Sequence, residues 1–158
     1  MTFRDGSIDG VIWKPLTFFR DHRGWLCELF RHDELPDEYH PVMAYTSMTE
    51  PGIARGPHEH VDQADYFCFI GPSDFKVYLW DARPKSRTHG KKEVRVVGEA
   101  APFGLVVPPG VVHAYQNVGG KPGLVFNGAN RLYKGRGKKE PVDEIRHEEQ
   151  DGSPYRLD

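Results

Sequence analysis

Histidine and carboxylate side chains gather in one short stretch of the chain. Residues 52–60 read GIARGPHEH and lead to Asp65. His58 and His60 are separated by one residue, so on an extended segment their side chains point to the same side. Two imidazoles with a nearby carboxylate are suitable ligands for a divalent transition metal. Taken alone, the stretch also fits a polar surface loop, because the neighbouring residues are hydrophilic.

A further histidine stands in a second stretch, residues 104–117, which reads GLVVPPGVVHAYQN. Pro108 and Gly110 predict a turn between two runs of β-branched residues, and His113 begins the strand that follows. Taken alone, this is a hairpin with an incidental histidine. The candidate metal ligands of the two stretches together are His58, His60, Asp65 and His113.

Short strand-like runs separated by turn residues must position these side chains. The 17 Gly and 13 Pro residues are dispersed along the chain, which argues against long helices. Phe75, Val77 and Leu79 alternate with other residues and so share one face of a predicted sheet. One helical turn is expected within residues 32–38. The predicted strands, spaced as in an antiparallel sandwich or barrel, are residues 10–14, 25–30, 42–48, 66–70, 75–81, 93–97, 104–107, 111–117 and 123–127.

Length and charge narrow the class of protein. A chain of 158 residues suits one domain, which we place at 1–133, followed by a charged extension at 134–158 that is packed on the domain or partly mobile. The net charge of −2 argues against a nucleic-acid partner. No apolar run approaches the roughly 18 residues of a membrane span, and the polar N-terminus is unlike a secretory signal. With Cys27 and Cys68 expected as free thiols, we predict a cytoplasmic protein without a membrane partner.

The two histidine stretches together resemble the paired motifs of the cupin superfamily. The first resembles the pattern G-x5-H-x-H followed by a carboxylate and a later glycine, and the second matches P-x-G-x2-H-x3-N. This resemblance implies an all-β fold, the cupin or double-stranded β-helix jelly roll, with antiparallel strands and little helix. The predicted strands agree with such a fold.

Further segments resemble the dTDP-4-dehydrorhamnose 3,5-epimerase family, in the same order along the chain. They are DHRGW at 21–25 with Glu28, RGPH at 55–58, DARPKSRTHG at 81–90 and PPGVVHAY at 108–115. The resemblance implies an isomerase that acts on a nucleotide-linked 4-keto-6-deoxy sugar without a cofactor. It also implies a homodimer, with exchange of an N-terminal strand as one form of it.

The expected chemistry follows from the acidity of C–H bonds next to a keto group. A base removes the proton, an enolate forms, and an acid returns a proton from the opposite face. The resemblance places His58 as the base, because a neutral imidazole accepts protons near neutral pH. It places the substrate-binding groups at Arg23 and Arg55 for the diphosphate, at His113 for the sugar or its oxyanion, and at Glu28 on the substrate side.

The sequence departs from the family at the acid and at the orienting carboxylate. Phe126 aligns with the family's tyrosine acid, and a phenyl ring has no proton to donate. Tyr133 is near in sequence but is expected in the next turn or strand. The family's base is oriented by an aspartate in a C-terminal segment, for which Asp143 and Asp151 are the available substitutes here.

Two further departures add metal-binding side chains. Asp65 aligns with a family lysine, and His60 aligns with a family glutamine. These changes favour an alternative function, a metal-dependent cupin enzyme that acts on another small molecule through a divalent metal on His58, His60, Asp65 and His113. A third alternative is a non-catalytic module that binds a sugar nucleotide, because the usual acid is missing.

Overall fold

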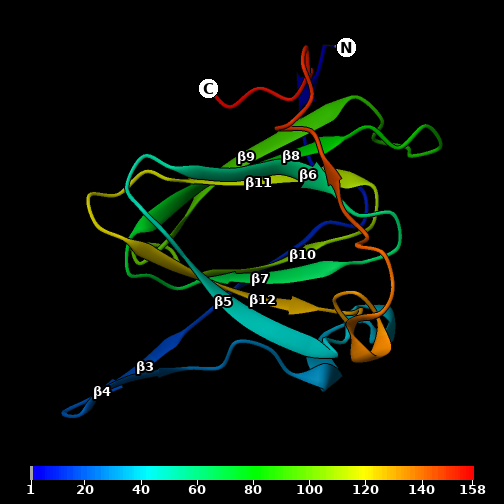
Figure 1. Ribbon diagram of the computed structural model, residues 1–158. Helices are drawn as coiled ribbons and strands as arrows, with labels where there is room; N and C mark the ends of the chain where they lie inside the picture. Colours follow the sequence, from blue (N-terminus) through cyan, green and yellow to red (C-terminus); the bar gives the residue numbers. More distant parts are fainter. Residues whose placement is uncertain (1) are drawn as a thin grey trace.

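The computed structural model describes residues 2–158, in which most strands form two facing sheets (Figure 1). Neighbouring strands pair in antiparallel fashion, except for the parallel pair β1–β9. The first sheet has six strands in the order β1 (Arg4–Asp5), β9 (Lys91–Gly98), β8 (Asp74–Asp81), β11 (Val111–Asn117), β6 (Ala54–Glu59) and β13 (Ile145–Arg146).

The second sheet is fully antiparallel, and a separate hairpin projects away from it in Figure 1. Its order is β2 (Ile12–Pro15), β10 (Phe103–Val107), β7 (Asp65–Phe69), β12 (Gly123–Ala129) and β5 (Met43–Thr49). The hairpin pairs β3 (Phe18–Asp21) with β4 (Gly24–Cys27), and the helical segments are the short 3₁₀ turns η1 (His32–Glu34), η2 (Asp37–Tyr39) and η3 (Arg136–Lys138).

This architecture confirms the predicted all-β jelly roll with little helix. Each predicted strand overlaps an observed one, and the helical turn expected at 32–38 appears as η1 and η2. Strand β6 was not predicted, because Gly56 and Pro57 inside it read as turn residues. None of the helical segments in residues 2–158 is long and apolar enough to cross a membrane.

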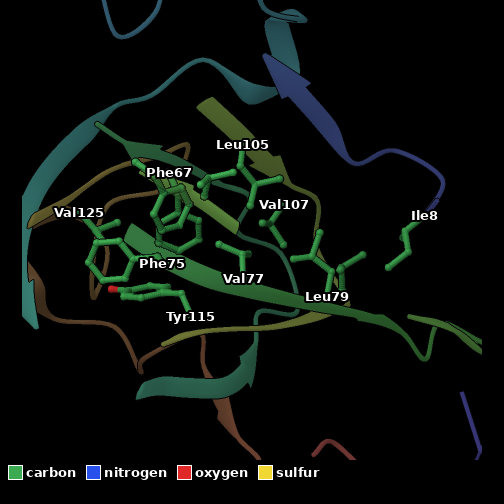
Figure 2. Packing of buried hydrophobic residues seen from close by; sticks show 12 residues of the cluster. Ile8, Phe67, Phe75, Val77, Leu79, Leu105, Val107, Tyr115 and Val125 are labelled. Carbon is green, nitrogen blue, oxygen red and sulfur yellow. The ribbon is translucent and has the colours of Figure 1, made fainter. Parts of the chain in front are cut away.

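The main core lies between the two sheets. Phe75, Val77 and Leu79 of β8 point inward, as their alternation predicts, and meet Phe67 of β7 and Leu105 of β10 (Figure 2). Each is at most 3% exposed. Fully burying an aliphatic or aromatic side chain of this size contributes about 1.5–3 kcal/mol, so this cluster holds the sheets against each other.

The opposite face of β8 is covered by the end of the chain. Tyr78 and Trp80 point away from the main core and pack with Tyr155 and Leu157. In Figure 1 the segment after β12 runs alongside β6, where it adds β13 to the sheet, and ends near the N-terminus. Residues of the predicted 134–158 extension therefore lie next to the strand that carries His58.

Candidate active site

Strands β6 and β11 bring two of the predicted histidines face to face. His58 pairs with His113 in the strand register, and their ring centroids are 4.4 Å apart. The register shifts just beyond His113, where Gly56 adopts a φ of +81°. A Cβ atom at Gly56 would lie 2.5 Å from the His113 carbonyl oxygen, so the bulge that aligns the histidines requires glycine there.

His60 and Asp65 complete the cluster from the two sides of the barrel. His60 follows β6, and Asp65 begins β7 in the other sheet. The Asp65 Oδ2 atom lies 3.1 Å from His60 Nε2 and 3.4 Å from His113 Nε2. One ring nitrogen from each of His58, His60 and His113 lies within 4.8 Å of the others. The structure thus brings together all four residues that the sequence selects as metal ligands.

The charges of this cluster are set by burial and by Asp65. Burial, together with His113 and His60, lowers the pKa of His58 to about 2, so its imidazole is neutral at physiological pH. Burial also opposes charge on His60, but Asp65 outweighs it and raises the pKa of His60 to about 9. Burial raises the pKa of Asp65, but His113 and His60 outweigh that effect and hold this pKa well below its usual range. The cluster therefore contains a neutral base beside an imidazolium–carboxylate pair.

The donor set fits a divalent transition metal. His113 Nδ1 lies 3.1 Å from the Val111 carbonyl oxygen, and His60 Nδ1 contacts the Asp143 carbonyl oxygen. Carbonyl partners of this kind fix a ring's tautomer and leave Nε2 free to bind a metal. The Nε2 atom of His113 is buried and has no hydrogen-bond partner within residues 2–158. A divalent metal on these residues would polarise a bound carbonyl oxygen.

His58 and His60 line a cavity of about 1730 Å³. This is larger than the roughly 300–1,000 Å³ of pockets that hold drug-sized ligands, and it suits a longer molecule. Arg55, predicted for phosphate binding, lines it and donates to Thr49 Oγ1 at 2.9 Å and to the Met48 carbonyl oxygen at 2.7 Å. Further basic side chains of the lining, which sequence reasoning missed, are Arg131, Lys134, Lys138 and Arg146.

Arg23 and Glu28 do not line this cavity within one chain. Arg23 is exposed at the turn of the β3–β4 hairpin, where its Nε donates to Asp21 Oδ2 at 3.0 Å. Glu28 follows the hairpin and forms a 3.7 Å ion pair with Arg31. The hairpin projects away from the barrel (Figure 1), so the roles predicted for these two residues in substrate binding stay predictions.

Phe126 does not occupy the position of an acid. Its neighbours Val125 and Asn127 are buried on the inner face of β12, so Phe126 faces outward and packs against Phe30 and Tyr66. The alignment that placed the acid there is therefore wrong, because no side chain at this position reaches the cavity. Within residues 2–158, the tyrosines that line the cavity are Tyr45, Tyr115 and Tyr133.

The carboxylate nearest to His58 is Glu148, which sequence reasoning missed. Its Oε1 lies 4.0 Å from His58 Nδ1. The substitutes predicted for the orienting aspartate are wrong. The Asp143 carboxylate accepts hydrogen bonds from the backbone of residues 61–63, and Asp151 is exposed in a turn. Glu148 could be found only from the pairing of β13 with β6, which carries no signal in the sequence.

Comparison with known proteins identifies the family of this chain. Residues 5–138 match the model of the dTDP-4-dehydrorhamnose 3,5-epimerase family. A probable low-salt glycan biosynthesis epimerase, Agl13 of Haloferax volcanii, is 35% identical over 80% of this chain and 81% of its own length. The spore coat polysaccharide biosynthesis protein SpsL of Bacillus subtilis is 38% identical over 73% of this chain and 75% of its own.

The fold is shared with solved structures at lower sequence identity. A dTDP sugar isomerase from Desulfovibrio desulfuricans superposes with a TM-score of 0.79 at 22% identity, covering 94% of this chain and 91% of its own. The resemblance predicted from the motifs and the predicted enzyme class, an isomerase, are thereby confirmed. The chain belongs to the dTDP-4-dehydrorhamnose 3,5-epimerase family, a family of sugar-nucleotide epimerases.

Proposed function

We propose that this protein epimerises a dTDP-linked 4-keto-6-deoxy sugar, with His58 as the base that removes a proton next to the keto group. The observation that carries this proposal is the neutral His58 imidazole, which lines the cavity between His113 and Glu148. Its pKa, lowered to about 2, keeps the ring unprotonated. Glu148 orients the ring and stabilises the imidazolium that forms when His58 takes the proton.

The cluster next to His58 stabilises the enolate. Protonated His60 is held by Asp65, and its positive charge offsets the negative charge that develops on the keto oxygen. Arg55 lines the same cavity, and its guanidinium, oriented by Thr49 and Met48, binds the diphosphate. The additional basic side chains of the lining supply charge for the same phosphates.

A second copy of the chain is part of this proposal. The β3–β4 hairpin exposes Phe19, Trp25 and Leu26 at 58%, 51% and 61% of their surface. Such apolar exposure on a projecting hairpin suits contact with another copy of the chain. In a homodimer that uses this contact, the hairpin carries Arg23 and Glu28 toward the partner's cavity, where they contact the nucleotide.

Turnover of dTDP-4-keto-6-deoxyglucose in deuterium oxide tests the proposed function. We expect deuterium to enter next to the keto group and the epimerised product to appear. In a His58→Gln variant, the rates of deuterium incorporation and of product formation should both fall by about 100-fold or more. His89→Gln changes a histidine outside the cavity and serves as the matched control, with activity equal to the wild type. Binding of the nucleotide sugar without any exchange would leave only a binding module.

The convergence of His58, His60, Asp65 and His113 supports a second candidate function, a metal-dependent enzyme acting on another small molecule. In that case His58 is a ligand and is not available as the base. Metal analysis of protein purified without chelators separates the two candidates. Near-stoichiometric iron, zinc, nickel or manganese that is lost in His60→Ala and kept in His89→Ala would favour the metal enzyme. Protein without metal that turns over the sugar nucleotide would exclude it.

A further inference from the structure

We propose that Tyr45 is the acid that returns a proton to the enolate, on the face opposite to His58. This inference rests on the proposed function and names a catalytic residue for it. Tyr45 lies on β5 of the five-stranded sheet, whereas His58 lies on β6 of the six-stranded sheet. Both side chains line the same cavity. A sugar ring bound between the two sheets therefore meets the base on one side and Tyr45 on the other.

The hydrogen bonds around Asn127 fix the direction in which the Tyr45 hydroxyl donates. Asn127 Nδ2 lies 2.9 Å from Asp65 Oδ1, and the ionised carboxylate can only accept, so the amide nitrogen must face it. The same Nδ2 lies 2.9 Å from Tyr45 Oη and donates its second hydrogen there. Because the amide nitrogen has no lone pair to offer, Tyr45 accepts this bond and keeps its own proton for the cavity.

Burial keeps this arrangement rigid. Asn127 is 1% exposed and Asp65 is 2% exposed. Asp65 also accepts a hydrogen bond from Gln63 Nε2 at 2.8 Å, pairs with His60 at 3.1 Å, and lies 3.4 Å from His113 Nε2. Rotation of the Asn127 amide would place its oxygen against the carboxylate, which carries no proton to share. The network thus links the orientation of the Tyr45 hydroxyl to the histidine cluster.

The other tyrosines of the cavity are placed less favourably. The Tyr115 hydroxyl is 3.1 Å from Ser47 Oγ, and Tyr115 lies on β11, in the same sheet as His58. A proton from that sheet would arrive on the side from which His58 removed one. Tyr133 is 50% exposed, about as much as Tyr45 at 48%, but it lies in the turn after β12 and its hydroxyl has no hydrogen-bond partner within residues 2–158. Of these three tyrosines, Tyr45 lies in the sheet opposite to His58, and its hydroxyl is hydrogen-bonded to the buried Asn127.

Solvent restores the protonation states of Tyr45 and His58 after each proton transfer. Burial raises the pKa of Tyr45 to about 12, against the opposing effect of the Asn127 hydrogen bond, so the phenol is protonated at neutral pH. A phenol is nevertheless a stronger acid than a C–H bond next to a keto group. The enolate carbon forms a C–H bond with the proton, the O–H bond of Tyr45 breaks, and its electron pair stays on the phenolate oxygen. Water then reprotonates Tyr45, and His58 releases its proton to water.

Exchange and epimerisation can be measured separately in Tyr45→Phe. Without the acid, His58 still removes the proton and returns one from solvent to the same face. In deuterium oxide we expect Tyr45→Phe to incorporate deuterium into dTDP-4-keto-6-deoxyglucose within about threefold of the wild-type rate, while the epimerised product falls by about 100-fold. Nuclear magnetic resonance of the sugar follows both quantities. Tyr115→Phe and Tyr133→Phe are the matched controls and should keep exchange and epimerisation coupled.

Several outcomes would overturn the role of Tyr45. One is wild-type epimerisation by Tyr45→Phe, and another is uncoupling in Tyr133→Phe or Tyr115→Phe in its place. Loss of exchange and epimerisation together in folded Tyr45→Phe would indicate substrate positioning and would also contradict the proposal. Absence of exchange in the wild-type protein would overturn the proposed function, and the assignment of Tyr45 with it.

Discussion

Histidines of one cluster differ in charge because their polar neighbours differ. His58 and His113 are both buried imidazoles, yet His113 is tied to the Val111 carbonyl while His58 faces Glu148. His60 carries a proton because Asp65 lies 3.1 Å from its Nε2 atom. The same side-chain type is thus neutral at His58 and protonated at His60, within one cluster.

The contact between Glu148 and His58 leads to a first prediction. Glu148→Gln keeps the size of the side chain but removes the charge that stabilises the His58 imidazolium. We expect kcat to fall by roughly tenfold or more while KM stays within about twofold, because the changed interaction develops only during proton removal. Steady-state kinetics measure both. Glu50→Gln is the matched control, since Glu50 is exposed and lies outside the cavity. An unchanged kcat in Glu148→Gln would contradict the orienting role.

Asp81 leads to a prediction about stability and pH. Burial raises the pKa of Asp81, but hydrogen bonds from Arg83, Ser86 and Thr88 outweigh it and hold the pKa below its usual range. A carboxyl group with a lowered folded pKa stabilises the fold above its unfolded pKa, about 3.9, and loses this contribution as the pH falls toward the folded value.

We therefore expect Asp81→Asn to lower the free energy of unfolding at about pH 7 by roughly 1.5–3 kcal/mol, as for other hydrogen bonds to charged groups. The difference from the wild type should shrink as the pH falls below about 4, where the wild-type carboxyl begins to take up a proton. Urea unfolding at several pH values measures it. Asp37, whose side chain is 99% exposed, provides the control: the effect of Asp37→Asn on the free energy of unfolding should not change with pH. A difference that is constant with pH would mean that the charge of Asp81 is not involved.

At the scale of elements, the bulge between β6 and β11 aligns the histidines and depends on Gly56. We expect Gly56→Ala to lower the free energy of unfolding by about 2 kcal/mol or more, because a side chain disfavours the positive φ and its Cβ would collide with the His113 carbonyl. Activity should fall further than stability explains, since relief of the collision separates His58 from His113. Gly52→Ala is the matched control. It also has a positive φ, of 77°, but no atom within 4 Å of its Cβ.

The equilibrium unfolding of both glycine variants, measured beside their residual activity, separates strain from misalignment. Equal losses of unfolding free energy in Gly56→Ala and Gly52→Ala would show that the positive φ alone causes the loss, without a contribution from the collision with the His113 carbonyl. A Gly56→Ala protein with full activity would contradict the role of the bulge in aligning the histidines.

The elements differ in how far the sequence could predict them. Period-two alternation in β8 predicts which side chains enter the core, because the pattern is local. The histidine motif predicts the convergence of His58, His60, Asp65 and His113, because its spacing recurs in a known fold. Glu148 and Tyr45 were beyond prediction. Their positions depend on the pairing of β13 with β6 and of β5 with β12, and such long-range register leaves no local signal.

At the scale of the whole molecule, Arg23 can contact a substrate only if two chains assemble. Arg23 lies on the projecting β3–β4 hairpin, outside the cavity that contains His58. In the proposed homodimer each active site takes His58 from one copy and Arg23 from the other. A chain with His58→Gln and a chain with Arg23→Ala are then each inactive in pure form, but a mixed dimer contains one site with both residues intact.

Mixing the two variants after unfolding and refolding should restore about a quarter of wild-type activity, because half of the dimers are mixed and one of their two sites is intact. Light scattering on the same samples reports whether dimers are present. A double variant, His58→Gln with Arg23→Ala, refolded with wild-type chain is the control. Its mixed dimers carry a defect in both sites, so only the wild-type homodimers, about a quarter of the dimers, should be active, whereas about half of the activity would remain if Arg23 served the site of its own chain. Failure of the single variants to complement each other, in samples shown to be dimeric, would place Arg23 outside the partner's active site and would remove the hairpin from catalysis.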